Sequence, residues 1–271
     1  MNKDEFYLTL PSNSSMRYFG DNTTTKYTTQ LPRQIELTGE WKVALVEVQY
    51  PTTLQTVTAG SNTVRLHQHI SPKPADLFDD IPKSKDNRVT AHVLRIQPGV
   101  YTGIEQIVRA LSGVSLLAKH FEFGYAGIAK DRIAVTRICG CTTGHYLSFS
   151  PGLYQQLGFT KVTQNIVKTL EADHPYNVTA GMPAQMFVYC DITEPRIVGD
   201  VYAPLLRIVQ TNGKDLRHGS SETKTLSPPH YLPLLNSNFR TIDIDIRDQL
   251  RRPLPFTHGT LTVTLRFRRI H

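Results

Sequence analysis

The sequence predicts an all-β fold, a β-sandwich or barrel that carries one or two short helices in its connections. Short runs of alternating apolar and polar residues recur along the 271 residues, which is the pattern of half-buried strands. Clusters of glycine, proline and polar residues separate these runs, and one segment alone has a convincing helical period. Many short strands, with helices only in the excursions between them, are typical of a sandwich or barrel.

The strands of the first half of the chain follow from alternation and β-propensity. Phe6, Leu8 and Leu10 alternate with more polar neighbours and predict a first strand. Residues 41–50, WKVALVEVQY, are apolar on both faces, so we expect this strand in the middle of a sheet, ended by Pro51. Further strands are predicted at residues 26–30, 63–69, 88–96, 120–125, 132–138 and 145–150.

In the second half, strands are predicted at residues 166–169, 185–191 and 201–209. The two strands nearest the C-terminus show the strictest alternation. Their predicted core-facing residues are Ile242, Ile244, Ile246, Leu261, Val263, Leu265 and Phe267. Their outward, charged residues are Asp243, Asp245, Arg247, Arg266 and Arg268. A long connection with two prolines and a glycine separates these strands, and the pattern leaves open whether they are hydrogen-bonded neighbours.

One segment has the period of an amphipathic helix. Ile104, Ile107, Val108 and Leu111 fall at i, i+3, i+4 and i+7, which places them on one face. Thr102 is expected to cap the N-terminus of this helix, and a glycine follows its last turn. A second, shorter helical turn is predicted within residues 151–157.

The chain is expected to form a single domain over residues 1–271. No internal repeat and no linker-like composition divides it, and β-sandwiches of this size are common. Residues 71–88 are rich in Pro, Asp and Lys, and residues 210–229 are polar with paired prolines. Both segments are predicted to be long loops of that domain.

Composition limits the partners. The net charge is +7 at pH 7 and is spread along the chain, so we expect weak, sequence-independent attraction to nucleic acid. The start, MNKDEFYLTL, is too polar for a secretory signal, and no run approaches the roughly 20 apolar residues of a membrane span. Three cysteines with one tight pair are not a disulfide framework. These features indicate production in the reducing interior of a cell, without secretion.

Motifs for catalysis and cofactor binding do not occur in the sequence. It has no GxSxG nucleophile motif, no HExxH and no phosphate-binding glycine loop. Cys139 and Cys141 have one residue between them and His145 nearby, whereas structural zinc pairs usually have at least two, so the spacing favours a turn. A Cys/His nucleophilic dyad stays open, because adjacency in space is invisible in a sequence. We expect no catalytic residue, no cofactor and no metal.

Two other groups look like incomplete ligand sets. His67 and His69 share a strand face without a third ligand, which favours a solvated or interface pair. Asp243, Asp245 and Asp248 form an acidic run, but an outward charged strand face explains the alternation better than calcium or magnesium binding does. The basic end, RFRRIH, fits nucleic-acid stacking as well as the outward face of an amphipathic strand, and the second reading is preferred for its first two arginines.

Three regions of the sequence resemble one known family. They are FYLTLPSNSS, the DNT element at residues 21–23, KYTTQLP, ELTGEWKVAL and the E-x-Q-YP ending near the N-terminus; LYQQLGFT at residues 153–160; and TIDIDIRDQLRRPLPFTHGTLTVTLRFRR at residues 241–269. These segments are similar to the penton (minor capsid) proteins of Polinton/Maverick elements and their adintovirus relatives. The segments at 55–100 and 195–230 carry no such similarity.

The resemblance implies a single jelly-roll β-sandwich that sits at the five-fold vertices of an icosahedral capsid. It implies a homopentamer, contact with a double jelly-roll major capsid protein and a place in the virion. It implies no catalytic residues. Because such genes also lie integrated in eukaryotic genomes, a co-opted cellular copy has the same sequence features. The five outward charged residues of the last two strands are the candidates for the subunit interface.

Two alternatives of other classes stay open. A β-sandwich binding module, for a carbohydrate or a protein, has the same strand pattern, because this fold class hosts many functions. An enzyme on a jelly-roll scaffold, such as a metal-dependent cupin, needs clustered histidine and carboxylate ligands. No such cluster can be found in the sequence, so a non-enzymatic structural protein is the preferred reading.

Overall fold

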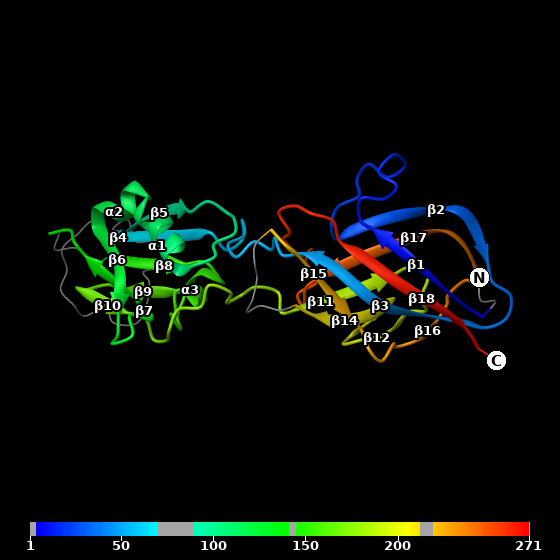
Figure 1. Cartoon of the computed structure of the whole chain (residues 1–271). Helices are drawn as coiled ribbons and strands as arrows, with labels where there is room; N and C mark the ends of the chain where they lie inside the picture. Colours follow the sequence, from blue (N-terminus) through cyan, green and yellow to red (C-terminus); the bar gives the residue numbers. More distant parts are fainter. Residues whose placement is uncertain (1–3, 70–88, 141–144, 212–218, 271) are drawn as a thin grey trace. The chain divides into compact units, whose positions relative to one another are not determined.

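The computed structural model describes residues 4–69, 89–140, 145–211 and 219–270 (Figure 1). Their contacts group the chain into two compact units. Unit 1 is built from residues 1–54 and 183–271, and unit 2 from residues 55–182, which are inserted between two strands of unit 1. The sequence predicts one domain over 1–271, because it shows no internal repeat and no linker-like composition, and no change of composition marks the two crossings between the units.

Unit 1 contains two antiparallel sheets. The first has the order β1-β18-β3-β15, with β16 also paired to β3, and the second has the order β14-β11-β17-β2. The strands of the first sheet are β1 (Glu5–Pro11), β3 (Trp41–Pro51), β15 (Ser221–Thr225), β16 (Leu232–Pro233) and β18 (Thr262–Arg269). Those of the second are β2 (Lys26–Glu36), β11 (Gln185–Cys190), β14 (Leu205–Gln210) and β17 (Asn238–Arg247).

This order is that of a jelly roll. The chain begins in the first sheet with β1, crosses to the second with β2 and returns with β3. After unit 2 it adds β11 and β14 to the second sheet, β15 to the first, β17 to the second and β18 to the first. Apart from the two-residue β16, these are eight strands that wrap between two sheets, which defines the fold, so the predicted all-β jelly roll is confirmed. A small hairpin, β12 (Arg196–Val198) and β13 (Val201–Ala203), lies outside both sheets.

The core of unit 1 confirms the alternation of the last two strands. All seven residues predicted to face the core have exposed fractions of 0%. The two strands are not hydrogen-bonded neighbours, because β17 lies between β11 and β2, whereas β18 lies between β1 and β3. Phe267 joins the two sheets by stacking on Phe6 and on Phe239, with ring centroids 4.6 and 5.8 Å apart.

Unit 2 has its own sheets and helices. One sheet has the order β5-β4-β8-β9, from β4 (Thr63–His69), β5 (Val89–Arg95), β8 (His145–Phe149) and β9 (Thr163–Asn165). The other has the order β10-β7-β6, from β6 (Phe121–Ala126), β7 (Arg132–Arg137) and β10 (Thr169–Glu171). The helices are α1 (Ile104–Ser112), α2 (Ser115–His120) and α3 (Leu153–Gln156). A continuous apolar cluster fills this unit, so it has a core of its own.

Several local predictions for unit 2 are wrong. Residues 166–168 form no strand, because β9 ends before the buried Ile166 and β10 begins after it. Thr102 is not the N-cap of α1; that place belongs to Gly103, which makes no side-chain cap, while Gln106 donates to the hydroxyl of Thr102 at 3.2 Å. Helix α2 is absent from the prediction because its six residues are too short to show a helical period.

Two further predicted segments, a strand and a loop, differ in the structure. The predicted strand over 201–209 is divided between β13 and β14 by Pro204, which cannot donate to a ladder. The predicted loop over 210–229 contains the strand β15. Its sequence SETKT has polar residues on both faces, so it lacks the alternation that predicts a strand. The predicted loop over 71–88 lies outside the described residues.

Candidate subunit interface

The outer face of β18 carries a cluster of arginine and aromatic side chains. Arg266 donates from Nε and Nη2 to the two carboxylate oxygens of Glu5, each at 2.8 Å, and its guanidinium lies 5.6 Å from the ring centre of Tyr7. The hydrogen bond from Arg266 lowers the pKa of Glu5. Arg268 lies 5.9 Å from the ring centre of Tyr231. Planar cations over aromatic faces are a common element of protein interfaces.

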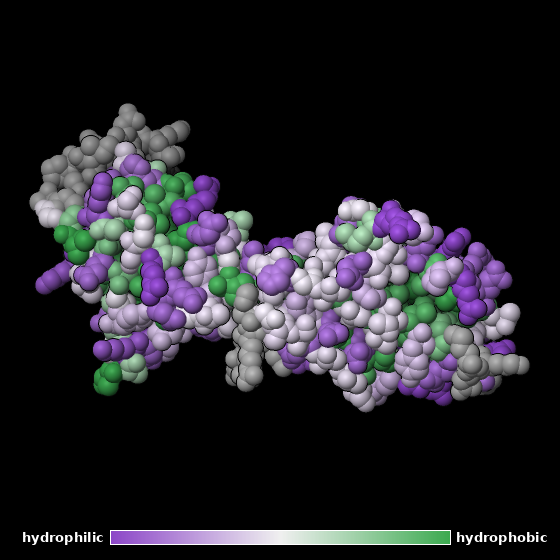
Figure 2. Space-filling model, turned by 45° about the horizontal axis from the view of Figure 1, so that its top comes forward, coloured by the Kyte–Doolittle hydropathy of each residue, from purple (hydrophilic) through white to green (hydrophobic). Residues whose placement is uncertain are grey.

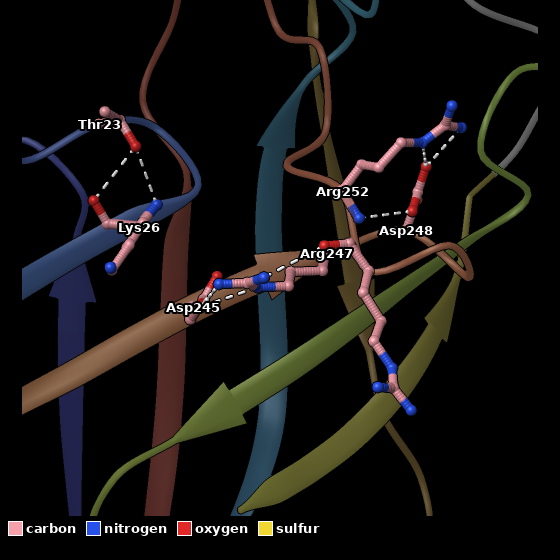
Figure 3. A network of polar contacts seen from close by, with 7 residues as sticks. Thr23, Lys26, Asp245, Arg247, Asp248 and Arg252 are labelled. Carbon is pink, nitrogen blue, oxygen red and sulfur yellow. Dashed lines mark hydrogen bonds and ion pairs between the residues drawn. The ribbon is translucent and has the colours of Figure 1, made fainter. Parts of the chain in front are cut away.

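The outer face of β17 carries a second charged cluster (Figure 3). Arg247 donates to Asp245 Oδ2 from Nε at 2.9 Å and from Nη2 at 2.6 Å, and from Nη1 to the carbonyl of Arg251 at 3.1 Å. Asp243 lies two residues earlier on the same face, and its backbone N–H donates to Asp191 Oδ1 at 2.8 Å. Asp245 and Arg247 therefore neutralise one another within the chain.

Asp248 has a different role from its two acidic neighbours. Its side chain is buried, and Oδ1 accepts the backbone N–H of Leu250 at 2.8 Å. It also accepts the backbone N–H of Arg252 at 2.9 Å (Figure 3). Arg252 Nε donates to Oδ2 at 2.8 Å. Asp248 thus holds the turn after β17, and among the described residues the acidic run forms no group that could hold a metal ion.

A cavity of about 490 Å³ opens on the outer face of β17 and β11. Its walls combine the exposed ring of Tyr202 with charged groups. Burial raises the pKa of Asp191 to about 6, and the carboxylate of Asp243 adds to the rise. The lining residues include three of the five candidate interface residues, Asp243, Asp245 and Arg247.

The structure places the five candidates on two separate faces of unit 1. Asp243, Asp245 and Arg247 share one sheet, and Arg266 and Arg268 share the other. In a sandwich the outer faces of the two sheets point away from each other. Among the described residues Asp243 and Arg268 have no ion-pair partner, whereas Arg266 pairs with Glu5 and Arg247 with Asp245. Figure 2 shows hydrophilic and hydrophobic residues mixed over the surface in view.

Several residues at these faces were not predictable. Glu5 and Tyr7 alternate with Phe6, which marks them as outward, but their contact with Arg266 depends on the register Tyr7↔Arg266 between the first and last strands. Asp191 directly follows β11, and only the pairing of β11 with β17 brings it next to Asp243. Tyr202 belongs to the hairpin β12–β13, which sequence patterns do not separate from β14.

The cysteine and histidine residues that the sequence suggests as possible metal ligands lie in unit 2. Cys139 follows β7 and is disulfide-bonded, and Cys141 lies outside the described residues. Ligand atoms of Cys139, His145 and His120 all lie within 4.8 Å of one another. His120 is the member that the sequence does not reveal, because it belongs to a different element. His67 does not belong to this group: its Nε2 forms a hydrogen bond with Oγ of Ser148 at 3.1 Å. Burial lowers the pKa of His67.

No protein-family model matches the sequence, and the search of curated proteins finds no match. The jelly-roll fold is shared with a solved structure. The mavirus penton protein superposes with a TM-score of 0.54 and 10% identity, covering 98% of this chain and 100% of that one. A chain of the Sputnik virophage structure has a TM-score of 0.47 and 11% identity, with 98% of each chain covered. None of the described helices is long and apolar enough to cross a membrane.

Proposed function

We propose that this chain is a non-enzymatic structural protein of a virion, a penton subunit that forms pentamers at the five-fold vertices of an icosahedral capsid. One observation carries the proposal: the whole chain, unit 2 included, shares its fold with the full length of the mavirus penton protein. The resemblance of the terminal and central segments to Polinton/Maverick pentons points the same way. Partners would be copies of itself and a double jelly-roll major capsid protein, after production in the reducing interior of the host cell.

A closed ring requires two different patches on each subunit, which meet head to tail. The outer faces of the two sheets of unit 1 supply such a pair. The β18 face carries Arg268, which has no ion-pair partner within the described parts of the chain, and the β17 face carries Asp243 next to Asp191. Opposite charges on the two patches would steer neighbouring subunits into register. The number five comes from the family resemblance.

Exchanging the two charges tests this arrangement. We expect Asp243→Arg and Arg268→Asp, each alone, to weaken association about tenfold or more, because like charges then face each other across the interface. The double variant restores the opposite pair and should recover most of the association. Native mass spectrometry over a concentration series measures the pentamer fraction, with and without the major capsid protein.

Exposed charges of unit 2 provide the matched control, because Lys161→Glu and Glu171→Arg change the net charge by the same amounts outside the two patches. Equal losses from these variants would show a general charge effect and contradict the assigned faces. A chain that stays monomeric with and without any capsid protein would favour the binding module, for which the cavity of Tyr202 and Asp191 is the specific candidate.

The raised pKa of Asp191 predicts a pH dependence of stability. Its value of about 6 lies above the ordinary 3.8, so between about pH 4 and pH 6 the folded state keeps a proton that the unfolded state releases. The free energy of unfolding should therefore fall as the pH rises through this window. We expect a loss of about 1 kcal/mol, because solvent still reaches the side chain.

Replacing the carboxylate by its amide isolates this contribution. Asp191→Asn keeps the oxygen that accepts the backbone N–H of Asp243 but does not ionise. Urea unfolding at a series of pH values should show that the difference in stability between the variant and the wild type grows from pH 4 to pH 6 in favour of the variant. A constant difference across this range would mean that Asp191 titrates at its ordinary pKa.

A further inference from the structure

Three residues from different elements of unit 2 lie close together. His120 is the last residue of α2, Cys139 follows β7, and His145 begins β8. The backbone holds them together, because the N–H of Ile138 donates to the carbonyl of His120 at 2.9 Å, directly before Cys139. The imidazole rings of His120 and His145 lie 4.9 Å apart, and the side chain of His145 is buried.

Gln68 connects the two histidines. It lies opposite His145 in the pairing of β4 with β8, and its amide nitrogen is 2.9 Å from His120 Nε2 and 3.5 Å from His145 Nε2. The other ring nitrogen of His120, Nδ1, is buried and has no hydrogen-bond partner. A buried polar atom without a partner costs about 1–3 kcal/mol, so its position calls for a ligand.

The contact with Gln68 shows how that nitrogen could serve a metal. Metal-binding histidines usually donate the N–H of the second ring nitrogen to a neighbouring oxygen. Exchanging the oxygen and nitrogen of the Gln68 amide, which differ little in shape, would let Oε1 accept the N–H of His120 Nε2. The lone pair of Nδ1 would then be available for coordination.

We propose that unit 2 holds a reduction-dependent zinc site, in which the sulfur of Cys139 and one ring nitrogen each of His120 and His145 bind a single Zn²⁺. Imidazole and thiolate are the ligands that zinc prefers, with bonds of about 2.0–2.3 Å in a tetrahedron. One ligand atom of each residue lies within 4.8 Å of those of the other two. Nε of Arg137 lies 3.4 Å from Sγ of Cys139 and places a positive charge beside the anionic sulfur.

The oxidation state of Cys139 decides whether the site can form. Cys139 is disulfide-bonded in the structure, and a disulfide sulfur is not a thiolate ligand. Two molecules of a low-molecular-weight thiol reduce the disulfide to two protein thiols and are themselves oxidised to one disulfide. Zn²⁺ then replaces the proton of the Cys139 thiol, which is released to solvent. The oxidised protein should be free of metal and the reduced protein should bind it, whereas the sequence alone predicts no metal in either form.

Cobalt(II) provides the test, because its bond to a thiolate has an ultraviolet charge-transfer band that Zn²⁺ abolishes on displacement. The full chain is titrated with Co²⁺ after reduction by a phosphine and, in parallel, in its oxidised form. We expect a saturable band at one equivalent in the reduced protein alone. Zinc should also raise the melting temperature of the reduced protein, since it binds the folded state.

Variants identify the ligands. Cys139→Ser and His120→Gln should each abolish the band, and Gln68→Leu should weaken binding about tenfold, as expected of a residue that orients a ligand. The matched controls are His67→Gln on the neighbouring strand β4 and Cys190→Ala in the core of unit 1, both of which should keep the band. Circular dichroism checks that each variant is folded. A reduced wild type without the band, or a folded Cys139→Ser or His120→Gln variant that keeps it, would overturn the proposal.

Discussion

Replacing Ile244 with Asp is expected to unfold unit 1. Ile244 is fully buried on β17, where it lies opposite Cys190 of β11 and Tyr27 of β2. Aspartate at this position loses the burial of the isoleucine side chain and places a carboxylate among apolar groups with no partner. The combined cost of about 4–5 kcal/mol is close to the lower end of the roughly 5–15 kcal/mol by which domains are stable. Thermal melting followed by circular dichroism should show no cooperative transition for unit 1.

Two variants separate the effect of charge from that of position. Ile244→Val removes one methylene group from the same place and should cost about 0.5–1.5 kcal/mol. Asp243→Asn changes the exposed neighbour and should leave the melting temperature nearly unchanged. If Ile244→Asp melts like the wild type, the burial of this strand face and its place in the middle of the sheet are both refuted.

The strands with one buried face were predictable because their alternation reports directly which side chains leave water. This holds for β17 and β18, whose core residues match the prediction at every position. It fails for β15, where SETKT is polar on both faces, and at residues 166–168, where the apolar Ile166 is buried outside any strand. Alternation measures burial, and burial does not always coincide with strand pairing.

The division into two units was not predictable for a related reason. Gln55–Met182 begins and ends between strands of ordinary composition, and its own core uses the same apolar residue types as unit 1. Contacts between the ends of the chain are equally invisible in a sequence. Arg266 meets Glu5 because the last strand pairs with the first, and His120 meets Cys139 through the pairing of β6 with β7. Only the register of the sheets brings these residues together.

The central segment LYQQLGFT resembles the family, but the resemblance does not say what the segment does in the fold. In the structure Gln156 is buried, and its amide donates to the carbonyls of Thr56 and Val178 at 2.7 and 3.1 Å. Gly158 ends α3 with a φ of +86°, in the left-handed region. Its carbonyl accepts the N–H of His174 at 2.9 Å, so two chain segments approach closely at this glycine. The motif therefore connects three parts of unit 2.

Gly158→Ala is consequently expected to destabilise unit 2 severely. A methyl group at this position would overlap the carbonyl oxygen of His174, a backbone atom that cannot move aside alone. The left-handed conformation adds about 1–2 kcal/mol for any residue with a side chain, and the overlap brings the expected loss to about 3–4 kcal/mol. Leu157 and Phe159, which flank the glycine, are both buried, so a shift of the backbone would also disturb the core.

Hydrogen exchange followed by mass spectrometry measures this loss in each unit separately. We expect Gly158→Ala to remove protection from β4 and α1 of unit 2 while β17 and β18 of unit 1 keep theirs, because each unit has its own core. Two controls separate the contributions. Gly199→Ala has a positive φ but open space around the methyl group and should cost about 1 kcal/mol, and Gly124→Ala has neither problem and should be nearly neutral. If unit 2 of Gly158→Ala keeps wild-type protection, the segment at His174 can move away from residue 158 without loss of stability, contrary to the packing described above.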